Sequence, residues 1–304
     1  MRRTFFIVGP TATGKSEIAA DVARKVGAEI VSADAFQIYR GLDLLTAKPE
    51  SSTLAKAPHH LIGIVPLGEE MNAEKFRRLA LRAVDEINSR GTLAIVAGGS
   101  GLYIKTLTHG LLPLPESDPE LREKLSAMSL DDLRSQLVEV DPETARKIDL
   151  KNRRRVVRAL EICSLTGKPV SAQPLCVGAS HSEAATGVFV FRDRQELYER
   201  INQRVEMMFE RGVIEEVRTA GEISQTASQM IGLREIRELL AGKKSIPQCI
   251  AEIQQATRRY AKRQLTWFRR QSNFLPLNLS FLTHNEAVKW ISLRILSEAG
   301  TNDD

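Results

Sequence analysis

The chain has 304 residues, of which 42% are hydrophobic, and it carries a net charge of +5 with a pI near 9.1. This length suits one large domain or one core with an inserted subdomain, and the hydrophobic content is enough for a proper core. No window approaches the roughly 20 apolar residues of a membrane-spanning helix, and no signal-peptide pattern opens the chain. The three cysteines fit neither a disulfide framework nor a zinc site. We therefore expect a cytoplasmic protein with no membrane partner.

The first predicted elements surround a phosphate-binding loop. Residues 5–8 form an apolar run that predicts a buried strand, and residues 17–26 have the pattern of a helix. Between them stands a full GxxxxGK(S/T) motif, made of Gly9, Pro10, Thr11, Ala12, Thr13, Gly14, Lys15 and Ser16.

Backbone N–H groups and the positive end of the helix converge on such a loop, which therefore predicts a bound polyphosphate. We expect Lys15 to place its charge on the terminal phosphates and the Ser16 hydroxyl to hold a magnesium ion. The alternative is a glycine turn that only joins the strand to the helix.

Strands and helices alternate through the first third of the chain. Residues 28–32 and 92–97 predict buried strands, and residues 74–89 predict a helix. This order is typical of βαβ units, hence of a parallel sheet covered by helices. The first of these strands leads to Asp34, whose carboxylate would lie in the ligand crevice beside the loop. There it could hold magnesium, accept a proton from a nucleophile or only cap the following turn.

The strand at residues 92–97 ends in glycines and not in an acid, so the second acidic motif of an ATPase or kinase is missing. From about residue 115 the pattern changes to charge-rich helices without strands, and residues 170–187 read as a loop. Residues 188–191 return as a buried strand, and helices are predicted over 195–218, 229–241 and 247–272. We therefore expect a core in two parts, residues 1–114 and 187–304, with a helical subdomain inserted at 115–186.

Two basic segments stand out among the helices. Residues 146–158 carry seven positive side chains against one Asp, a run that usually marks a solvated helix face. On residues 257–270, Arg259 and Arg263 lie on a different face from the apolar Ala261, Leu265 and Phe268. Two such helices on different subdomains indicate a cleft that grips a phosphate backbone from both sides.

Several motifs in a fixed order resemble those of the tRNA dimethylallyltransferases, also called tRNA isopentenyltransferases. They are the phosphate-binding loop and residues 32–43, 46–49, 58–61, 98–103, 154–161, 231–232 and 260–267. The resemblance implies an α/β fold, a P-loop NTPase-like parallel sheet flanked by helices with an inserted all-helical subdomain that binds tRNA. It also implies transfer of a dimethylallyl group from dimethylallyl diphosphate to the N6 amine of the adenine immediately 3′ of the anticodon, with Mg²⁺ required.

The resemblance further assigns roles to residues. Asp34 matches the general base, Lys15 and Ser100 are the other catalytic residues, and Arg218 matches an arginine near the diphosphate. Ser100 stands where the family commonly has Thr, and Leu233 where it usually has Tyr. The positions that match contacts with the tRNA anticodon stem-loop are Asp34, Ala35, Phe36, Gln37, Ser100, Arg122, Arg154, Arg155, Val156, Val157, Arg158, Gln229, Met230, Ile231, Gly232, Leu233 and Arg234, to which the basic helix adds Arg259 and Arg263.

The predicted protein is a monomer that extrudes its target base from the anticodon loop. Three other interpretations stay open on the sequence alone. An adenylate isopentenyltransferase would share the loop and Asp34 but would not need the two basic segments. A small-metabolite kinase would need a second acidic motif, and a nonenzymatic RNA-binding protein would not need the intact loop and Asp34.

Overall fold

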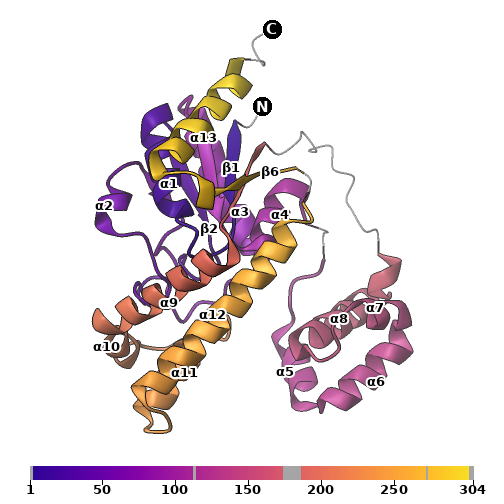
Figure 1. Cartoon of the computed structure of the whole chain (residues 1–304). Helices are drawn as coiled ribbons and strands as arrows, with labels where there is room; N and C mark the ends of the chain where they lie inside the picture. Colours follow the sequence, from indigo (N-terminus) through magenta and orange to yellow (C-terminus); the bar gives the residue numbers. More distant parts are fainter. Residues whose placement is uncertain (1–2, 112–113, 174–185, 272, 301–304) are drawn as a thin grey trace. The chain divides into compact units, whose positions relative to one another are not determined.

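The computed structural model describes residues 3–111, 114–173, 186–271 and 273–300. Contacts divide the chain into two compact units (Figure 1): a core of residues 1–108 and 182–304, and an insertion of residues 109–181. The sequence pattern set the limits of the insertion at 115 and 186. Most of the predicted loop at 170–187, and with it Cys176, lies outside the described residues.

A six-stranded parallel sheet in the order β3-β2-β4-β1-β5-β6 forms the centre of the core. Its strands are β1 (Thr4–Val8), β2 (Glu29–Ala33), β3 (His59–His60), β4 (Ala94–Gly98), β5 (Gly187–Phe191) and β6 (Leu275–Asn278). Val8 and Ala33 both pair with Gly98, so β1, β2 and β4 end side by side at one edge of the sheet. The phosphate-binding loop and Asp34 leave the sheet at this edge.

Helices cover both faces of the sheet. One face packs against α1 (Lys15–Val26) and α13 (His284–Gly300), which lie next to each other in Figure 1. The opposite face packs mainly against α3 (Ala73–Ser89), α4 (Gly101–His109), α11 (Leu233–Leu240) and α12 (Ile246–Phe268). The remaining helices of the core are α2 (Ser51–Leu54), α9 (Arg194–Glu210) and α10 (Val213–Arg218). The predicted fold class, a parallel sheet flanked by helices, is confirmed.

Two predicted helices are interrupted by glycines. The pattern at 195–218 is two helices, because Gly212 at φ 94° ends α9 and begins α10. In the pattern at 229–241, the α-helix starts only at Leu233, after Gly232 at φ 97°. Such left-handed backbone favours glycine, which has no Cβ to clash with the preceding turn. The long helix predicted at 247–272 is present as α12, which already ends at Phe268, and α9 packs along it through Leu197, Ile201 and Ala261.

In the described part of the insertion, the α-helices are α5 (Pro119–Ala127), α6 (Leu130–Val140), α7 (Pro142–Lys147) and α8 (Arg153–Thr166), and a short 3-10 helix follows at Val170–Ala172. Leu125, Leu133, Leu137 and Leu160 form the centre of its own apolar core. Each of these α-helices begins at a capping side chain whose oxygen accepts a hydrogen bond from the first turn. These caps are Asp118, Ser129, Asp141 and Asn152.

Asp141 is the most buried of these caps, with none of its surface exposed. Burial alone would raise its pKa, but hydrogen bonds from Thr144 and Ser171 outweigh that effect and hold the pKa well below its usual range. Cys163 and Cys249 are buried free thiols. Over the described part of the chain, no helix is long and apolar enough to cross a bilayer.

Candidate active site

The phosphate-binding loop joins β1 to α1 through two constrained glycines. A Cβ at Gly9 would lie 2.1 Å from the carbonyl oxygen of Val190 on the neighbouring strand, so no side chain fits there. Gly14 has φ 89° and is the N-cap of α1, which places the unpaired N–H groups of the first turn beside the loop. Ala12 between them has φ 66°, a strained value for a residue with a side chain.

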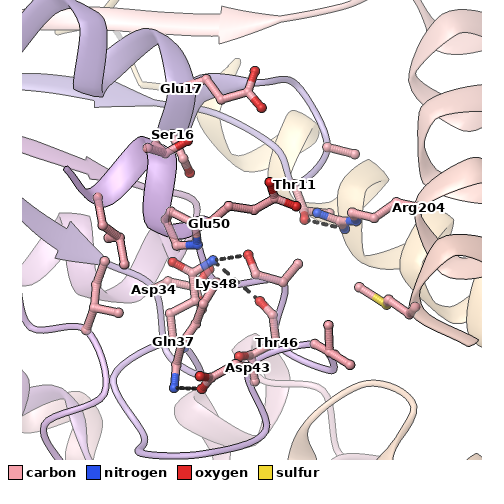
Figure 2. Close-up of a pocket in the computed structure, with 18 of the residues that line it drawn as sticks. Thr11, Ser16, Glu17, Asp34, Gln37, Asp43, Thr46, Lys48, Glu50 and Arg204 are labelled. Carbon is pink, nitrogen blue, oxygen red and sulfur yellow. Dashed lines mark hydrogen bonds and ion pairs between the residues drawn. The ribbon is translucent and has the colours of Figure 1, made fainter. Parts of the chain in front are cut away.

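The loop forms one wall of a cavity of about 1010 Å³, which lies wholly within the core. Figure 2 shows Ser16, Asp34 and Arg204 around it, with the segment from Gln37 to Glu50 as a further wall. The cavity therefore brings together the end of β1, the end of β2 and one side of α9, three parts that are far apart in the sequence.

Lys15 is half-buried in this cavity, and its Nζ donates a hydrogen bond of 3.2 Å to the Pro10 carbonyl. Burial lowers the pKa of Lys15 to about 8, the Asp34 carboxylate opposes this shift, and the Arg204 guanidinium adds to it. Ser16 and Asp34 also line the cavity. A hydroxyl and a carboxylate beside a phosphate site are the oxygen donors that Mg²⁺ prefers, so these residues fit that ion.

Asp34 directly follows β2, and its Oδ1 accepts hydrogen bonds from the backbone of Phe36 at 2.9 Å and of Gln37 at 3.2 Å. The carboxylate therefore does cap the following turn, in addition to facing the cavity. Ser100, in the turn between β4 and α4, supports the same turn, because its Oγ accepts a hydrogen bond of 2.9 Å from Ala35 N–H. The serine hydroxyl thus fixes the backbone beside Asp34 without the methyl of a threonine.

The segment after Asp34 is held by side chains that the sequence analysis did not select for this. Gln37 donates to the Ala47 carbonyl at 2.8 Å, and Lys48 Nζ donates to the Tyr39 and Gly41 carbonyls at 2.5 and 3.1 Å. From α10, the Glu216 carboxylate accepts hydrogen bonds from the backbone of Leu44 and Leu45. This wall of the cavity is therefore fixed by its own polar contacts.

Sequence reasoning also missed three arginines that contact the phosphate-binding loop. Arg192 follows β5, and Arg200 and Arg204 lie one turn apart on α9. Burial lowers the pKa of Arg204 to about 10. The i, i+4 spacing of Arg200 and Arg204 was the only signal available, and it is too common on helices to identify a phosphate site.

The structure corrects the expectation for Arg218. Its side chain is 58% exposed at the end of α10, forms an ion pair with Glu215 and does not line the cavity. The arginines nearest the loop come instead from β5 and α9. An i, i+3 acid on the same short helix holds the guanidinium of Arg218 at the surface.

The long helix α12 connects to the site through a buried amide. Gln264 accepts a hydrogen bond from Thr11 N–H at 2.9 Å and donates one to the Gly99 carbonyl at 2.7 Å. One turn earlier, the Tyr260 hydroxyl lies beside Ser100 and Gln264. Trp267 packs against Gly101, where a Cβ would lie 2.7 Å from the indole ring. Trp267 therefore packs against the core, and Tyr260 joins the polar contacts around Ser100 and Gln264.

The core residues proposed to contact tRNA fall into two groups, one with exposed and one with buried side chains. Arg259 and Arg263 are exposed on α12, opposite the buried Ala261 and Phe268, so the predicted basic face is present. Gln229 and Arg234 are exposed near α11, whereas Met230, Gly232 and Leu233 are buried and Ile231 is partly buried. The side chains of Met230 and Leu233 belong to the core cluster and are not available to RNA. The Leu at position 233 is therefore explained by packing.

The insertion shows the same division. Arg154 and Arg155 are exposed at the start of α8, and within the described residues neither has an ion pair. Val156 and Val157 lie in the apolar core of the insertion, so their side chains do not face RNA. Contact of these two positions with tRNA through other atoms stays a prediction.

Arg122 and Arg158 are occupied by the fully buried carboxylate of Glu161. Arg122 Nε lies 3.0 Å from Oε1, and Arg158 Nη1 lies 2.5 Å from Oε2. Arg158 also donates to the Pro115 carbonyl. In this structure Arg158 and Arg122 therefore both act as partners of a buried carboxylate.

Comparisons with known proteins place the chain in a family. The sequence profile of the IPP transferase family matches residues 37–271. The tRNA dimethylallyltransferase 1 of Citrifermentans bemidjiense is 44% identical over 274 residues, 87% of this chain and 88% of that protein. The tRNA dimethylallyltransferase of Akkermansia muciniphila is 40% identical over 297 residues, 98% of this chain and 99% of that protein. The crystal structure of the tRNA isopentenylpyrophosphate transferase from Bacillus halodurans, at 32% identity, aligns over 100% of both chains with a TM-score of 0.70. The chain therefore belongs to the IPP transferase family and, within it, to the tRNA dimethylallyltransferases.

Proposed function

We propose that this protein transfers a dimethylallyl group from dimethylallyl diphosphate to the N6 amine of the adenine immediately 3′ of the anticodon in tRNA, releasing diphosphate. The observation that carries the proposal is one cavity in which the phosphate-binding loop, Lys15 and the Asp34 carboxylate all take part. The loop supplies an anion site for the leaving group, and Asp34 supplies a base for the nucleophile.

In this reaction the allylic C–O bond breaks and its electron pair goes to the departing diphosphate. The N6 lone pair forms the new C–N bond, and an N6 proton passes to Asp34. The N–H groups of the loop and the Lys15 ammonium stabilise the negative charge that grows on the diphosphate. Magnesium, held by Ser16 and the diphosphate oxygens, would supply further neutralisation of the leaving group.

The exposed cations suit an RNA partner. Arg259 and Arg263 on α12, Arg234 on α11, and Arg154 and Arg155 on the insertion stand in solvent, where they can contact phosphates. A free nucleotide needs no such surface, which favours tRNA over the adenylate alternative. The proposed protein acts as a monomer in the cytoplasm on the anticodon stem-loop, whose target base leaves the stack to reach the cavity.

The test is an assay with labelled dimethylallyl diphosphate, offered with Mg²⁺ to tRNA from a strain lacking the modification and separately to AMP. Label should enter tRNA alone. Lys15→Ala should reduce turnover by roughly 100-fold or more with tRNA binding little changed, and Asp34→Asn should reduce it by roughly 100-fold to 10,000-fold with diphosphate binding retained. Label in AMP alone, or transfer of a γ-phosphate from ATP by the same protein, would refute the proposal.

A further inference from the structure

Two residues in the wall of the cavity have a backbone conformation that side chains disfavour. Leu42 has φ 53° and Ala47 has φ 50°, both in the left-handed region that favours glycine. Strained residues of this kind persist only where surrounding contacts fix them, and they gather at functional sites. They bound a stretch that we call the wall turn (residues 42–48), most of which lines the cavity together with the phosphate-binding loop.

The wall turn is held from α10 by one carboxylate. Glu216 Oε1 accepts a hydrogen bond from Leu44 N–H at 2.8 Å, and Oε2 accepts one from Leu45 N–H at 2.9 Å. Two successive backbone N–H groups that point to one spot form a binding site for an anion, and here a side chain of the same protein fills it. Hydrogen bonds to an ionised acceptor are also stronger than neutral ones. Glu216 therefore fixes the middle of the wall turn from a distant helix.

A continuous series of hydrogen bonds runs from Glu216 to the Asp34 carboxylate. Glu216 holds Leu44, whose carbonyl accepts a hydrogen bond of 3.1 Å from Ala47 N–H. The Ala47 carbonyl accepts one of 2.8 Å from Gln37 Nε2. Gln37 in turn donates its backbone N–H to Asp34 Oδ1 at 3.2 Å, and Figure 2 shows Asp34 and Gln37 in the same wall. The position of this carboxylate thus depends on the strained turn and on the residue that holds it.

The neighbouring residue on α10, Glu215, has a different set of contacts. Its carboxylate pairs with Arg218 on the same helix, and its side chain is 60% exposed. Glu215 and Glu216 share their charge, their length and their helix, but the hydrogen bonds to the wall turn come from Glu216. Glu215 is therefore a matched control for Glu216.

We propose that Glu216 is a positioning residue for Asp34, which it orients through the wall turn and the Gln37 side chain. This rests on the proposed function, in which Asp34 accepts the N6 proton. A proton acceptor works only within hydrogen-bond reach of the amine, so a small displacement of the carboxylate slows the transfer. The phosphate-binding loop is held by other side chains, among them Arg200 and Gln264, so diphosphate binding does not depend on Glu216.

The kinetics of the full chain with saturating tRNA and Mg²⁺ test this role. In Glu216→Gln an acceptor oxygen becomes a donor that faces a backbone N–H group, so kcat for prenyl transfer should fall by roughly 10-fold to 100-fold. The affinity and stoichiometry of inorganic diphosphate binding with Mg²⁺, measured by calorimetry, should not change. Glu215→Gln should change neither kcat nor diphosphate binding. A loss of diphosphate stoichiometry in proportion to the loss of kcat in Glu216→Gln would show a folding defect and overturn the proposal.

Gln37→Met tests the route by which Glu216 acts. This substitution keeps the length of the side chain but removes the amide that holds the Ala47 carbonyl. If the effect passes through Gln37, the double variant Glu216→Gln with Gln37→Met should lose little more kcat than Gln37→Met alone. Losses of kcat that multiply would overturn this route, and wild-type kcat in Glu216→Gln would overturn the proposal as a whole.

Residue-resolved amide exchange separates a failure of this proposal from a failure of the proposed function. In Glu216→Gln the amides of Leu44, Leu45 and Gln37 should exchange faster, while the amides of α1 should not change. Unchanged exchange at Gln37 would overturn the proposal whatever the kinetics show. If the wild-type protein prenylates no tRNA, the proposed reaction is removed, and faster exchange at Gln37 in the variant would still support the positioning role of Glu216.

Discussion

Replacing Arg158 by alanine is expected to loosen the insertion, whereas replacing Arg155 is expected to weaken RNA binding. Both residues lie in the same basic segment of α8, but Arg158 pairs at 2.5 Å with Glu161, whose side chain has 0% exposure. Removing one partner of a buried ion pair typically costs about 3–5 kcal/mol. Arg122 remains beside the carboxylate at 3.0 Å, and 32% of the Arg158 side chain is exposed, so we expect a cost below this range, about 2 kcal/mol.

Hydrogen exchange in the full chain measures this cost where it arises. A free-energy difference of about 1.4 kcal/mol changes an equilibrium constant tenfold. Where hydrogen exchange requires local opening of the helix, a loss of about 2 kcal/mol should therefore speed exchange of the α5 and α8 amides by roughly 30-fold. Exchange in the central sheet of the core should not change. Arg155→Ala, with an exposed side chain, should leave exchange unaltered and reduce the slope of log K against log salt for tRNA binding by about 0.7–0.9.

The opposite pattern, in which Arg158→Ala weakens RNA binding and Arg155→Ala loosens the insertion, would refute this reasoning. Wild-type exchange rates in Arg158→Ala, together with a lower salt slope, would mean that this guanidinium leaves Glu161 to bind a phosphate. An unchanged affinity and slope in Arg154→Ala, Arg155→Ala, Arg259→Ala and Arg263→Ala would remove RNA contact from both basic helices. The adenylate alternative would then be the better account of the cavity.

Two further predictions concern buried polar groups. Gln264→Met should lower the free energy of unfolding in urea by about 2–4 kcal/mol, because Thr11 N–H and the Gly99 carbonyl each lose a hydrogen-bond partner. The affinity for diphosphate should fall as well. A variant as stable as the wild type would contradict the link between α12 and the loop. Asp141, whose pKa is depressed in the folded protein, should stabilise the insertion above its unfolded pKa of about 3.9 and lose that contribution as the pH falls further. In Asp141→Asn the exchange rates of α7 amides should therefore rise at neutral pH and depend less on pH below about 4, and a wild-type pH profile would refute this.

The sequence predicted those parts of the site that a short segment encodes. The loop, its strand and its helix are contiguous, and Asp34 directly follows a strand, so pattern and position were enough to select them. The helix starts at Gly212 and Gly232 were missed because the helical spacing of apolar residues continues across both glycines. Strands β3 and β6 were missed because the first has two residues and the second contains Pro276, which is tolerated at a sheet edge.

The rest of the site depends on contacts between distant segments. Arg204 meets Thr11 across 193 positions, and Gln264 meets Thr11 across 253. Neither arginine spacing nor a lone glutamine signals such a contact in the sequence. The position of Arg218 away from the cavity and the burial of the α8 valine side chains were missed for a related reason, since motif comparison carries over whole segments without showing which side chains face inward.

The phosphate-binding loop owes its orientation to these distant contacts. Gln264 accepts a hydrogen bond from Thr11 N–H. Arg200 donates one to the Ala12 carbonyl, and Arg192 donates one to the Thr13 carbonyl. The peptide planes are therefore set before a ligand arrives, which explains how Ala12 keeps a φ of 66°. Donors fixed in this way need no reorientation as charge grows on a departing diphosphate, and preorganised donors lower a barrier most. The motif supplies the donors of the anion site, and α9 and α12 supply much of their orientation.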